Sequence, residues 1–203
     1  MSLITIIIII LSSSSSSSYI INLPKILRED ASHNYTIASS QFLKTHIYYI
    51  NPRIQQLTVF VPDNQAFADA SAAGYKILSI EDKYFVLKCH MINNYLSPSL
   101  LRNYTKMWHL HATMGTSITG NEKYTLNMTT TVNGSVEISN TVVRAIVTGT
   151  IYDRYPVAVY GVNQLLLPRE LPVILPPPTA DVSTTAVCGF KIFALLFFIF
   201  LIV

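Results

Sequence analysis

The sequence has few charged residues. Lys, Arg, Asp and Glu make up 12% of the 203 residues, against roughly 25% in an average soluble domain. The formal net charge is +3 and the basic residues form no stripe, so nucleic acid is not an expected partner. The low charge indicates that something other than Lys and Glu covers part of the surface, and attached sugar is a candidate.

Cysteine is also scarce. Cys89 and Cys188 are the two cysteines, too few for a disulfide scaffold. We expect Cys89 to be a small buried apolar residue. Cys188 lies at the edge of a hydrophobic C-terminal tail, so the two can pair only if the tail is cut beyond Cys188.

Patterns typical of enzymes and metal sites are missing. The seven glycines form no phosphate-binding loop, and the serine run over residues 12–18 has no Gly-x-Ser-x-Gly turn. His109 and His111 would share a strand face, but no Cys or carboxylate pair is spaced to complete a metal site. The acidic residues are too dispersed for a glycosidase pair. The sequence therefore predicts a protein that is not an enzyme and has no metal and no cofactor.

The N-terminus is typical of exported proteins. Residues 3–11 are almost wholly Ile and Leu, a run too short to span a bilayer but suited to the apolar part of a signal peptide. The serines that follow supply small residues for cleavage, although no Lys or Arg precedes the run. We expect residues 1–18 to be a signal peptide. An uncleaved interfacial segment is the alternative.

The C-terminus predicts an anchor. A Pro-rich and polar spacer over 171–185 precedes a hydrophobic tail over 186–203, a pattern typical of GPI-anchor signals. Ser183 and Asp181 are the attachment candidates. A membrane span is the rival, but Lys191 leaves only about 18 Å of apolar helix beyond it, against a hydrocarbon core of roughly 30 Å. The third alternative is that the tail is neither a GPI-anchor signal nor a membrane span.

The first half of the body reads mainly as helices. Residues 35–50 and 81–95 have apolar residues at helical spacing; in the second segment Tyr84, Leu87, Met91 and Tyr95 share a face. Residues 57–61 predict a strand. Asp63 is the expected N-cap of a helix over 64–73, with Gly74 following its end. Residues 99–106 predict a further short helix or turn.

The second half reads as strands. Residues 129–132 and 135–138 flank Asn133-Gly134, which predicts a type I′ hairpin turn. Residues 142–152 and 157–162 are further strands. Helices followed by antiparallel strands, with no visible repeat, predict a single α+β domain.

Four Asn-X-Ser/Thr triplets are candidates for N-glycosylation, at Asn34, Asn103, Asn127 and Asn133. Asn133 falls at the expected hairpin tip, where a glycan can project. Asn127 falls in a strand and is usable only if its side chain points outward. We expect at least two of the four to be occupied.

Three segments resemble signature motifs of fasciclin domains. Residues 58–67, Thr-Val-Phe-Val-Pro-Asp-Asn-Gln-Ala-Phe, resemble the N-terminal box of that family. Residues 87–91 resemble its Tyr-His motif, with Cys89 where Tyr is usual, and residues 157–168 resemble its C-terminal box, with Asn163 where Asp is common. Order and spacing agree over residues 30–168.

With its two ends included, the chain resembles plant fasciclin-like arabinogalactan proteins. The resemblance implies a domain over 28–170 in which helices pack on a twisted antiparallel or mixed β wedge. It also implies a role in adhesion or wall organisation and, in some members, a GPI anchor. Expected partners are matrix or cell-wall components or other cell-surface proteins, with the membrane reached through the tail. Ser97-Pro98 is the one Ser-Pro, Thr-Pro or Ala-Pro pair, so little arabinogalactan is expected.

The resemblance makes Cys89 and His90 adhesion candidates, because the family's histidine and its neighbours have been linked to adhesion. The physical interpretation of the motifs is structural. Core positions are expected at four apolar residues: Phe60, Phe67, Val159 and Leu166. His90 is expected to be a buried, hydrogen-bonded histidine on a helix, orienting a strand or loop. Three hypotheses follow: an adhesion module, a wall component acting through its glycans, and a degenerate family member.

Overall fold

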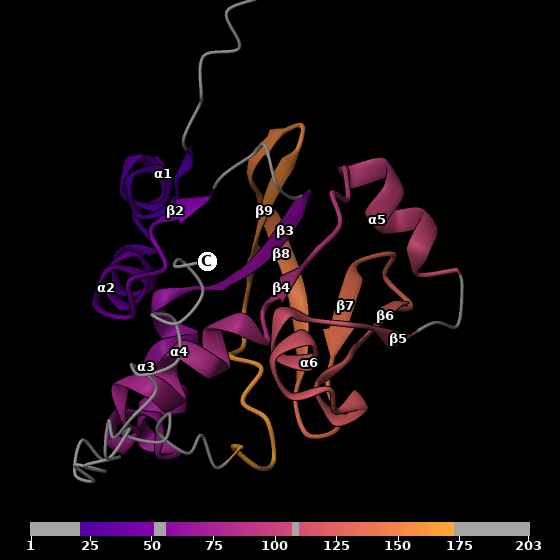
Figure 1. Ribbon diagram of the computed structural model, residues 1–203. Helices are drawn as coiled ribbons and strands as arrows, with labels where there is room; N and C mark the ends of the chain where they lie inside the picture. Colours follow the sequence, from indigo (N-terminus) through magenta and orange to yellow (C-terminus); the bar gives the residue numbers. More distant parts are fainter. Residues whose placement is uncertain (1–20, 51–55, 107–109, 173–203) are drawn as a thin grey trace, which may run out of the picture. The chain divides into compact units, whose positions relative to one another are not determined.

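A parallel pair of strands from opposite ends of the domain forms the centre of the fold. Strand β3 (Leu57–Pro62) pairs in parallel with β9 (Val157–Val162), and every residue of both is buried. The computed structural model describes residues 21–50, 56–106 and 110–172, which fall in one compact unit. Colours from opposite ends of the scale meet at this pair in Figure 1. Burial on both faces is typical of a strand covered on both sides.

The described strands form one sheet of seven and one of two. The larger sheet has the order β4 (Met91–Ile92), β3, β9, β8 (Arg144–Arg154), β7 (Val136–Ser139), β6 (Leu126–Thr130) and β5 (Leu110–His111). Each neighbouring pair in it is antiparallel except β3 and β9. The smaller sheet joins β1 (Ile21–Asn22) to β2 (Tyr49–Ile50). The expectation of an α+β fold with a mixed sheet is confirmed.

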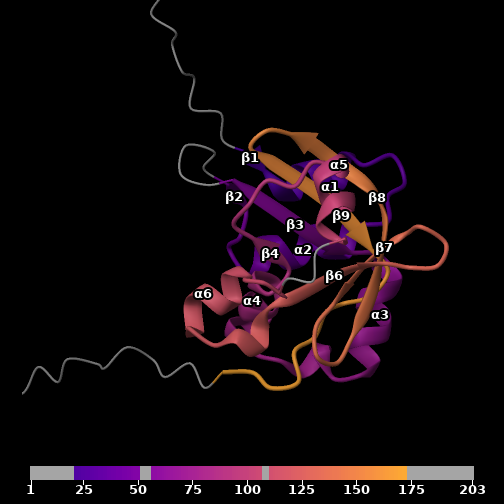
Figure 2. The same ribbon diagram turned by 90° about the vertical axis from the view of Figure 1, so that its right-hand side faces the viewer.

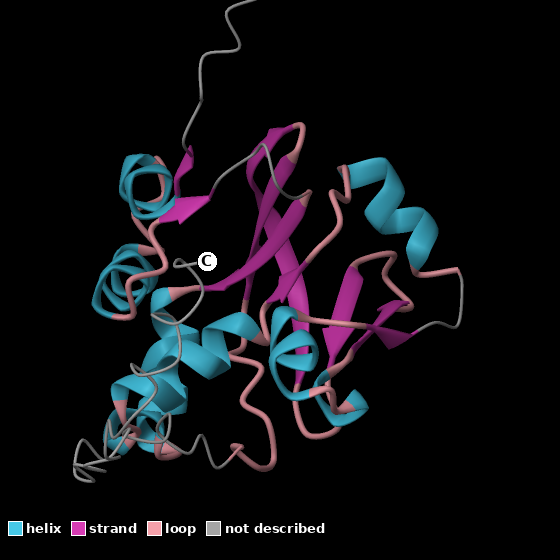
Figure 3. Cartoon of the chain, viewed as in Figure 1, coloured by secondary structure: helices cyan, strands magenta, loops and turns pink. Residues whose placement is uncertain are grey.

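The described helices are short. They are α1 (Leu23–Glu29), α2 (Thr36–Lys44), α3 (Asn64–Ala72), α4 (Ile80–Lys88), α5 (Pro98–Tyr104) and α6 (Met114–Thr119), with 3-10 turns η1 (Tyr75–Ile77) and η2 (Glu122–Tyr124). In Figures 1 and 3, α1 to α4 gather on one side of the central strands and α5 lies on the other. Figures 1 and 2 both place α4 beside α6.

The central strands separate two hydrophobic cores. Because side chains alternate along a strand, Val59 and Val159 face a first core that α1, α2 and α3 cover. Phe60 and Tyr160 face a second core shared with α5, β6 and β7, where their rings stack 6.1 Å apart. The predicted core residues Phe60, Phe67, Val159 and Leu166 are all buried.

Several local predictions are confirmed. The strands over 57–61 and 157–162 and the short helix after Pro98 are present. The Asp63 carboxylate accepts a hydrogen bond from the Ala66 N–H at 2.7 Å and so caps α3. Gly74 follows that helix with a φ of 108°.

The helix expected over 35–50 is too long: α2 ends at Lys44. His46 has a left-handed φ of 58°. The His46 and Ile47 N–H groups donate to the Leu43 and Phe42 carbonyls, which is a Schellman motif with histidine in the usual glycine position. The chain then turns to form β2.

The helix expected over 81–95 is also too long. α4 ends at Lys88, and Met91 and Ile92 form β4, paired with Val59 and Thr58 of β3. Met91 and Tyr95 therefore do not share a helix face with Tyr84 and Leu87, and His90 lies in a turn. Pairing with a strand distant in the sequence overrode a local helical pattern.

The 129–138 hairpin is present, but its turn type is wrong. Gly134 has a positive φ of 80°, whereas Asn133 is not among the positive-φ residues of the described chain. The Gly134 N–H donates to the Thr131 carbonyl, and the Thr131 N–H donates to the Ser135 carbonyl. This is a three-residue loop with a left-handed glycine, not a type I′ turn.

The predictions for the two ends lie outside the described residues. They include the signal peptide over 1–18, nearly all of the 171–185 spacer, the tail over 186–203, and the attachment candidates Ser183 and Asp181. Cys188 and His109 lie outside as well. Among the residues that are described, no helix has the length and apolar character to cross a membrane.

Candidate functional site

His90 connects three parts of the fold. It is fully buried in the turn between α4 and β4. Its Nδ1 lies 2.8 Å from the Val86 carbonyl, and its Nε2 lies 2.9 Å from the Leu166 backbone nitrogen. A carbonyl can only accept and an amide N–H can only donate, so Nδ1 carries the proton and Nε2 accepts: the ring is neutral.

The backbone of His90 adds a link to the N-terminal box. Its carbonyl accepts a hydrogen bond from the Phe60 N–H at 2.9 Å. Burial lowers the pKa of the ring to about 4, which keeps it neutral near pH 7. The expected buried, hydrogen-bonded histidine is confirmed, in a turn rather than on a helix, and it holds the C-terminal box against α4 and β3.

Cys89 is equally enclosed. Its side chain is 4% exposed and packs with Phe85 and Tyr124. Burial raises the pKa of the thiol to about 12, despite a hydrogen bond with Thr113, so the reactive thiolate is scarce. A Cβ on Gly115 would lie 2.4 Å from the Cys89 sulfur, so α6 closes directly over it. The adhesion role of Cys89 and His90 stays a prediction, and buried side chains can serve it only through the fold.

The N-terminal box also caps a helix that is distant in sequence. α2 begins without a side-chain cap from its own Tyr35. The Asn64 side chain takes that place: its Oδ1 accepts from the Ile37 N–H at 2.9 Å, and its Nδ2 donates to the His33 carbonyl at 3.2 Å. The sequence analysis missed this role, because no local pattern connects Asn64 with a helix that precedes it.

Two further polar positions of the boxes are structural as well. The buried Thr58 hydroxyl donates to the Asn94 carbonyl at 2.6 Å and accepts from the Leu96 N–H at 2.9 Å. The Asn163 side chain accepts from the Ile146 N–H of β8 at 2.7 Å. These motif side chains therefore help to maintain the fold.

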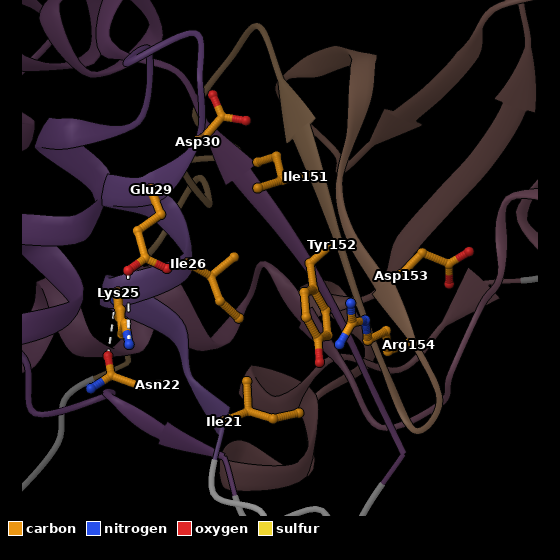
Figure 4. Close-up of a pocket in the computed structure, with 10 residues that line it drawn as sticks. All are labelled: Ile21, Asn22, Lys25, Ile26, Glu29, Asp30, Ile151, Tyr152, Asp153 and Arg154. Carbon is orange, nitrogen blue, oxygen red and sulfur yellow. Dashed lines mark hydrogen bonds and ion pairs between the residues drawn. The ribbon is translucent and has the colours of Figure 1, made fainter.

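A groove of about 650 Å³ lies between α1 and the end of β8 (Figure 4). One wall comes from the 21–30 segment, including Lys25, Ile26 and Glu29. The other comes from residues 151–154, including Tyr152 and Arg154. The sequence analysis did not find it, because its walls are more than a hundred positions apart in the numbering.

The four glycosylation candidates all lie toward solvent. Asn34, Asn103 and Asn133 are exposed, in the α1–α2 loop, α5 and the hairpin loop. Asn127 is half-exposed on β6 between the buried Leu126 and Met128. Side chains alternate along a strand, so Asn127 points outward, which N-glycosylation at this position would require.

No metal centre is found in the described part of the chain, where no three His, Cys, Asp or Glu side chains are grouped to hold an ion. His111 lies on the edge strand β5, with its ring 5.1 Å from that of Tyr104. The absence of a metal and a cofactor stays a prediction for the whole protein.

Comparison with known proteins identifies the family. The family model of the fasciclin domain matches residues 29–168. The chain belongs to the fasciclin domain family. Fasciclin-like arabinogalactan protein 4 of Arabidopsis thaliana is 38% identical to it over 169 residues, 78% of this chain and 39% of the relative. Fasciclin-like arabinogalactan protein 12 of the same plant is 30% identical over 115 residues, 57% of this chain and 44% of the relative.

The chain thus spans less than half the length of these two fasciclin-like relatives. Among solved structures, the FAS1 domain pair of the insect cell adhesion molecule fasciclin I is similar with a TM-score of 0.43 and 12% identity, covering 71% of this chain and 43% of that one. That likeness is too weak to carry an inference. Within this fasciclin domain the matched region begins at residue 29, so nearly all of α1 precedes it.

Proposed function

We propose that this chain is a non-enzymatic glycoprotein of the cell surface or cell wall, in which the fasciclin domain serves adhesion or wall organisation. The carrying observation is the family match over residues 29–168. The names of the Arabidopsis relatives, fasciclin-like arabinogalactan proteins, support it. The outward positions of all four sequon asparagines agree with a glycoprotein.

The non-enzymatic part of the proposal is supported by how the motif residues are used. His90 is buried and both ring nitrogens are occupied by backbone groups. Asp63 is a helix cap. Both side chains bind backbone groups of the fold, whereas a general acid or base has to reach a proton on a substrate.

Export and anchoring complete the proposal. Residues 1–18 act as a signal peptide, and the 186–203 tail directs attachment of a GPI anchor at Ser183 or Asp181. Phosphatidylinositol-specific phospholipase is expected to release the protein from membranes. Protein that stays in the membrane fraction would rule out the GPI anchor in favour of a retained span.

Adhesion is tested with beads carrying the protein purified from cells that express the full-length chain. If the domain itself is adhesive, beads aggregate with each other or bind wall fragments after N-glycosidase treatment. If deglycosylation abolishes wall association, the second hypothesis, a wall component acting through its glycans, is correct. Four outward-facing sequons give that alternative its support.

A further inference from the structure

The groove between α1 and β8 has the dimensions of a ligand site. Its volume of about 650 Å³ falls within the range of roughly 300–1,000 Å³ of small-molecule sites. Nothing in the roles of His90, Cys89 or the two boxes uses it. One of its walls, α1, lies almost entirely outside the region that the family model matches.

Part of the groove lining is apolar. Ile26, Ile151 and Tyr152 are partly buried and pack against the first core. Figure 4 shows Ile26 of α1 directed across the groove toward β8. Tyr152 contributes an aromatic ring to the groove lining, and such a ring supplies apolar surface at little cost in conformational entropy.

Charged groups of both signs surround these apolar residues. Lys25 and Glu29 of α1 form an ion pair at 3.8 Å and are 63% and 65% exposed. On the opposite wall, Tyr152 and Arg154 of β8 both line the groove. Among the described residues, the Arg154 guanidinium has no carboxylate within ion-pair distance.

The two other carboxylates of the lining, Asp30 and Asp153, already accept hydrogen bonds within the protein. Asp30 accepts a hydrogen bond from the Ser32 N–H at 3.0 Å. Asp153 is directed away from α1 in Figure 4 and accepts from the Tyr95 hydroxyl at 2.6 Å. The lining therefore has two cations and three carboxylates, of which Asp153 is hydrogen-bonded to Tyr95, so the groove has charges of both signs and a small net charge.

This combination selects the class of ligand. An apolar ligand would take these charged groups out of water without replacing their hydrogen bonds. A polyanion would meet Glu29 and Asp30 as well as the cations. A neutral sugar has hydroxyls that both donate and accept, and a C–H face that packs on an aromatic ring.

We propose that the groove binds a segment of a neutral polysaccharide, with one sugar ring against Tyr152 and its hydroxyls bonded to Arg154, Lys25 and Glu29. The inference rests on the proposed cell-wall role, for which it names the partner. Binding of this kind would allow the domain to hold wall polymers through its protein surface, independently of its own glycans.

The test is calorimetric titration of the protein, purified from plant cells that express the full-length chain and treated with N-glycosidase. The probes are xylohexaose, cellohexaose, galactohexaose and arabinohexaose, with hexagalacturonate as the anionic comparison. At least one neutral probe is expected to bind. Tyr152→Leu and Arg154→Gln are each expected to weaken that binding about three- to tenfold.

Tyr155→Leu is the matched control, because Tyr155 is 70% exposed and does not line the groove. It is expected to leave binding unchanged, and thermal unfolding verifies that all three variants fold. The proposal is overturned if no neutral probe binds at millimolar concentration, if only hexagalacturonate binds, or if Tyr152→Leu and Arg154→Gln bind like the parent protein. The bead assay does not depend on this result, so the groove can fail while the adhesion function stands.

Discussion

At the residue scale, His90 shows how a motif position can matter without meeting a partner. Its ring satisfies the Leu166 N–H and the Val86 carbonyl inside the core. When a buried polar group loses its partner, the free energy of unfolding falls by more than the hydrogen bond itself had contributed. His90 therefore controls whether the C-terminal box stays in place.

His90→Ala is expected to reduce the free energy of unfolding by roughly 3–5 kcal/mol, because it leaves two backbone groups unpaired and opens a cavity. Urea denaturation at pH 7 measures this loss. His33→Asn, at an exposed histidine with a left-handed φ of 52°, is the control and should change stability little. A His90→Ala protein that folds normally but no longer aggregates beads would support the adhesion role; normal folding and normal binding would exclude it.

The stability of the domain should depend on pH through His90. The pKa of His90 is lowered by burial to about 4 from 6.5, so as pH falls the unfolded chain takes up a proton before the folded one. The stability that neutral His90 contributes is complete above pH 6.5 and is lost as pH falls toward 4, by roughly 3 kcal/mol. Unfolding midpoints from pH 7 to 4 measure the loss. A His90→Gln variant should not show this loss of stability between pH 6.5 and 4. If its pH profile is identical to that of the parent protein, the loss does not come from His90.

Gly161 allows a test of the close packing between β9 and Tyr35. A Cβ there would lie 2.0 Å from the Tyr35 hydroxyl oxygen, so Gly161→Ala should cost about 1–3 kcal/mol through overpacking. Gly149→Ala, at the position paired with Gly161 in β8, meets nothing within 4 Å and is the matched control. Tyr35→Leu should relieve part of the cost in a double-mutant cycle; purely additive effects would show that Tyr35 is not the obstacle.

At the scale of the elements, the ends of α2 depend on the rest of the fold. Its C-terminus closes with a Schellman motif at His46, and its N-terminus is capped by Asn64 from α3. The two helices are therefore coupled through one side-chain amide.

Asn64→Ala is expected to destabilise the domain by about 1–2 kcal/mol and to increase hydrogen exchange at the Ile37 amide specifically. Gln65→Ala, one position along on the exposed face of α3, is the control. Unchanged protection of the Ile37 amide in the Asn64 variant would refute capping between the helices.

At the scale of the whole molecule, the surface carries the candidate glycosylation sites and the groove, while the motif residues Phe60, His90 and Leu166 are buried. We expect at least two of Asn34, Asn103, Asn127 and Asn133 to carry glycans in protein made by plant cells. Single Asn→Gln variants and mass spectrometry of the mature protein identify which sites are used and where both termini lie. Protein whose mass does not change with N-glycosidase would show that outward position alone is not enough.

The sequence by itself determined the features that depend on neighbours a few positions away. Strands β3 and β9, the Asp63 cap and left-handed Gly74 all follow from β-branched runs, a carboxylate before a helix, and a glycine after one. The three fasciclin motifs identified the family for the same reason, since each is a short contiguous string.

Only the tertiary structure decided what depends on distant contacts. Pairing with β3 ended the helix before Met91, although the local apolar spacing continued. The hydrogen bond from Leu166 to His90 spans 76 positions, and the one from Ile37 to Asn64 spans 27. The groove needs α1 beside the end of β8. Local propensities of tenths of a kcal/mol per residue cannot specify such contacts, because burial and satisfied backbone groups, worth about 1–3 kcal/mol each, outweigh them.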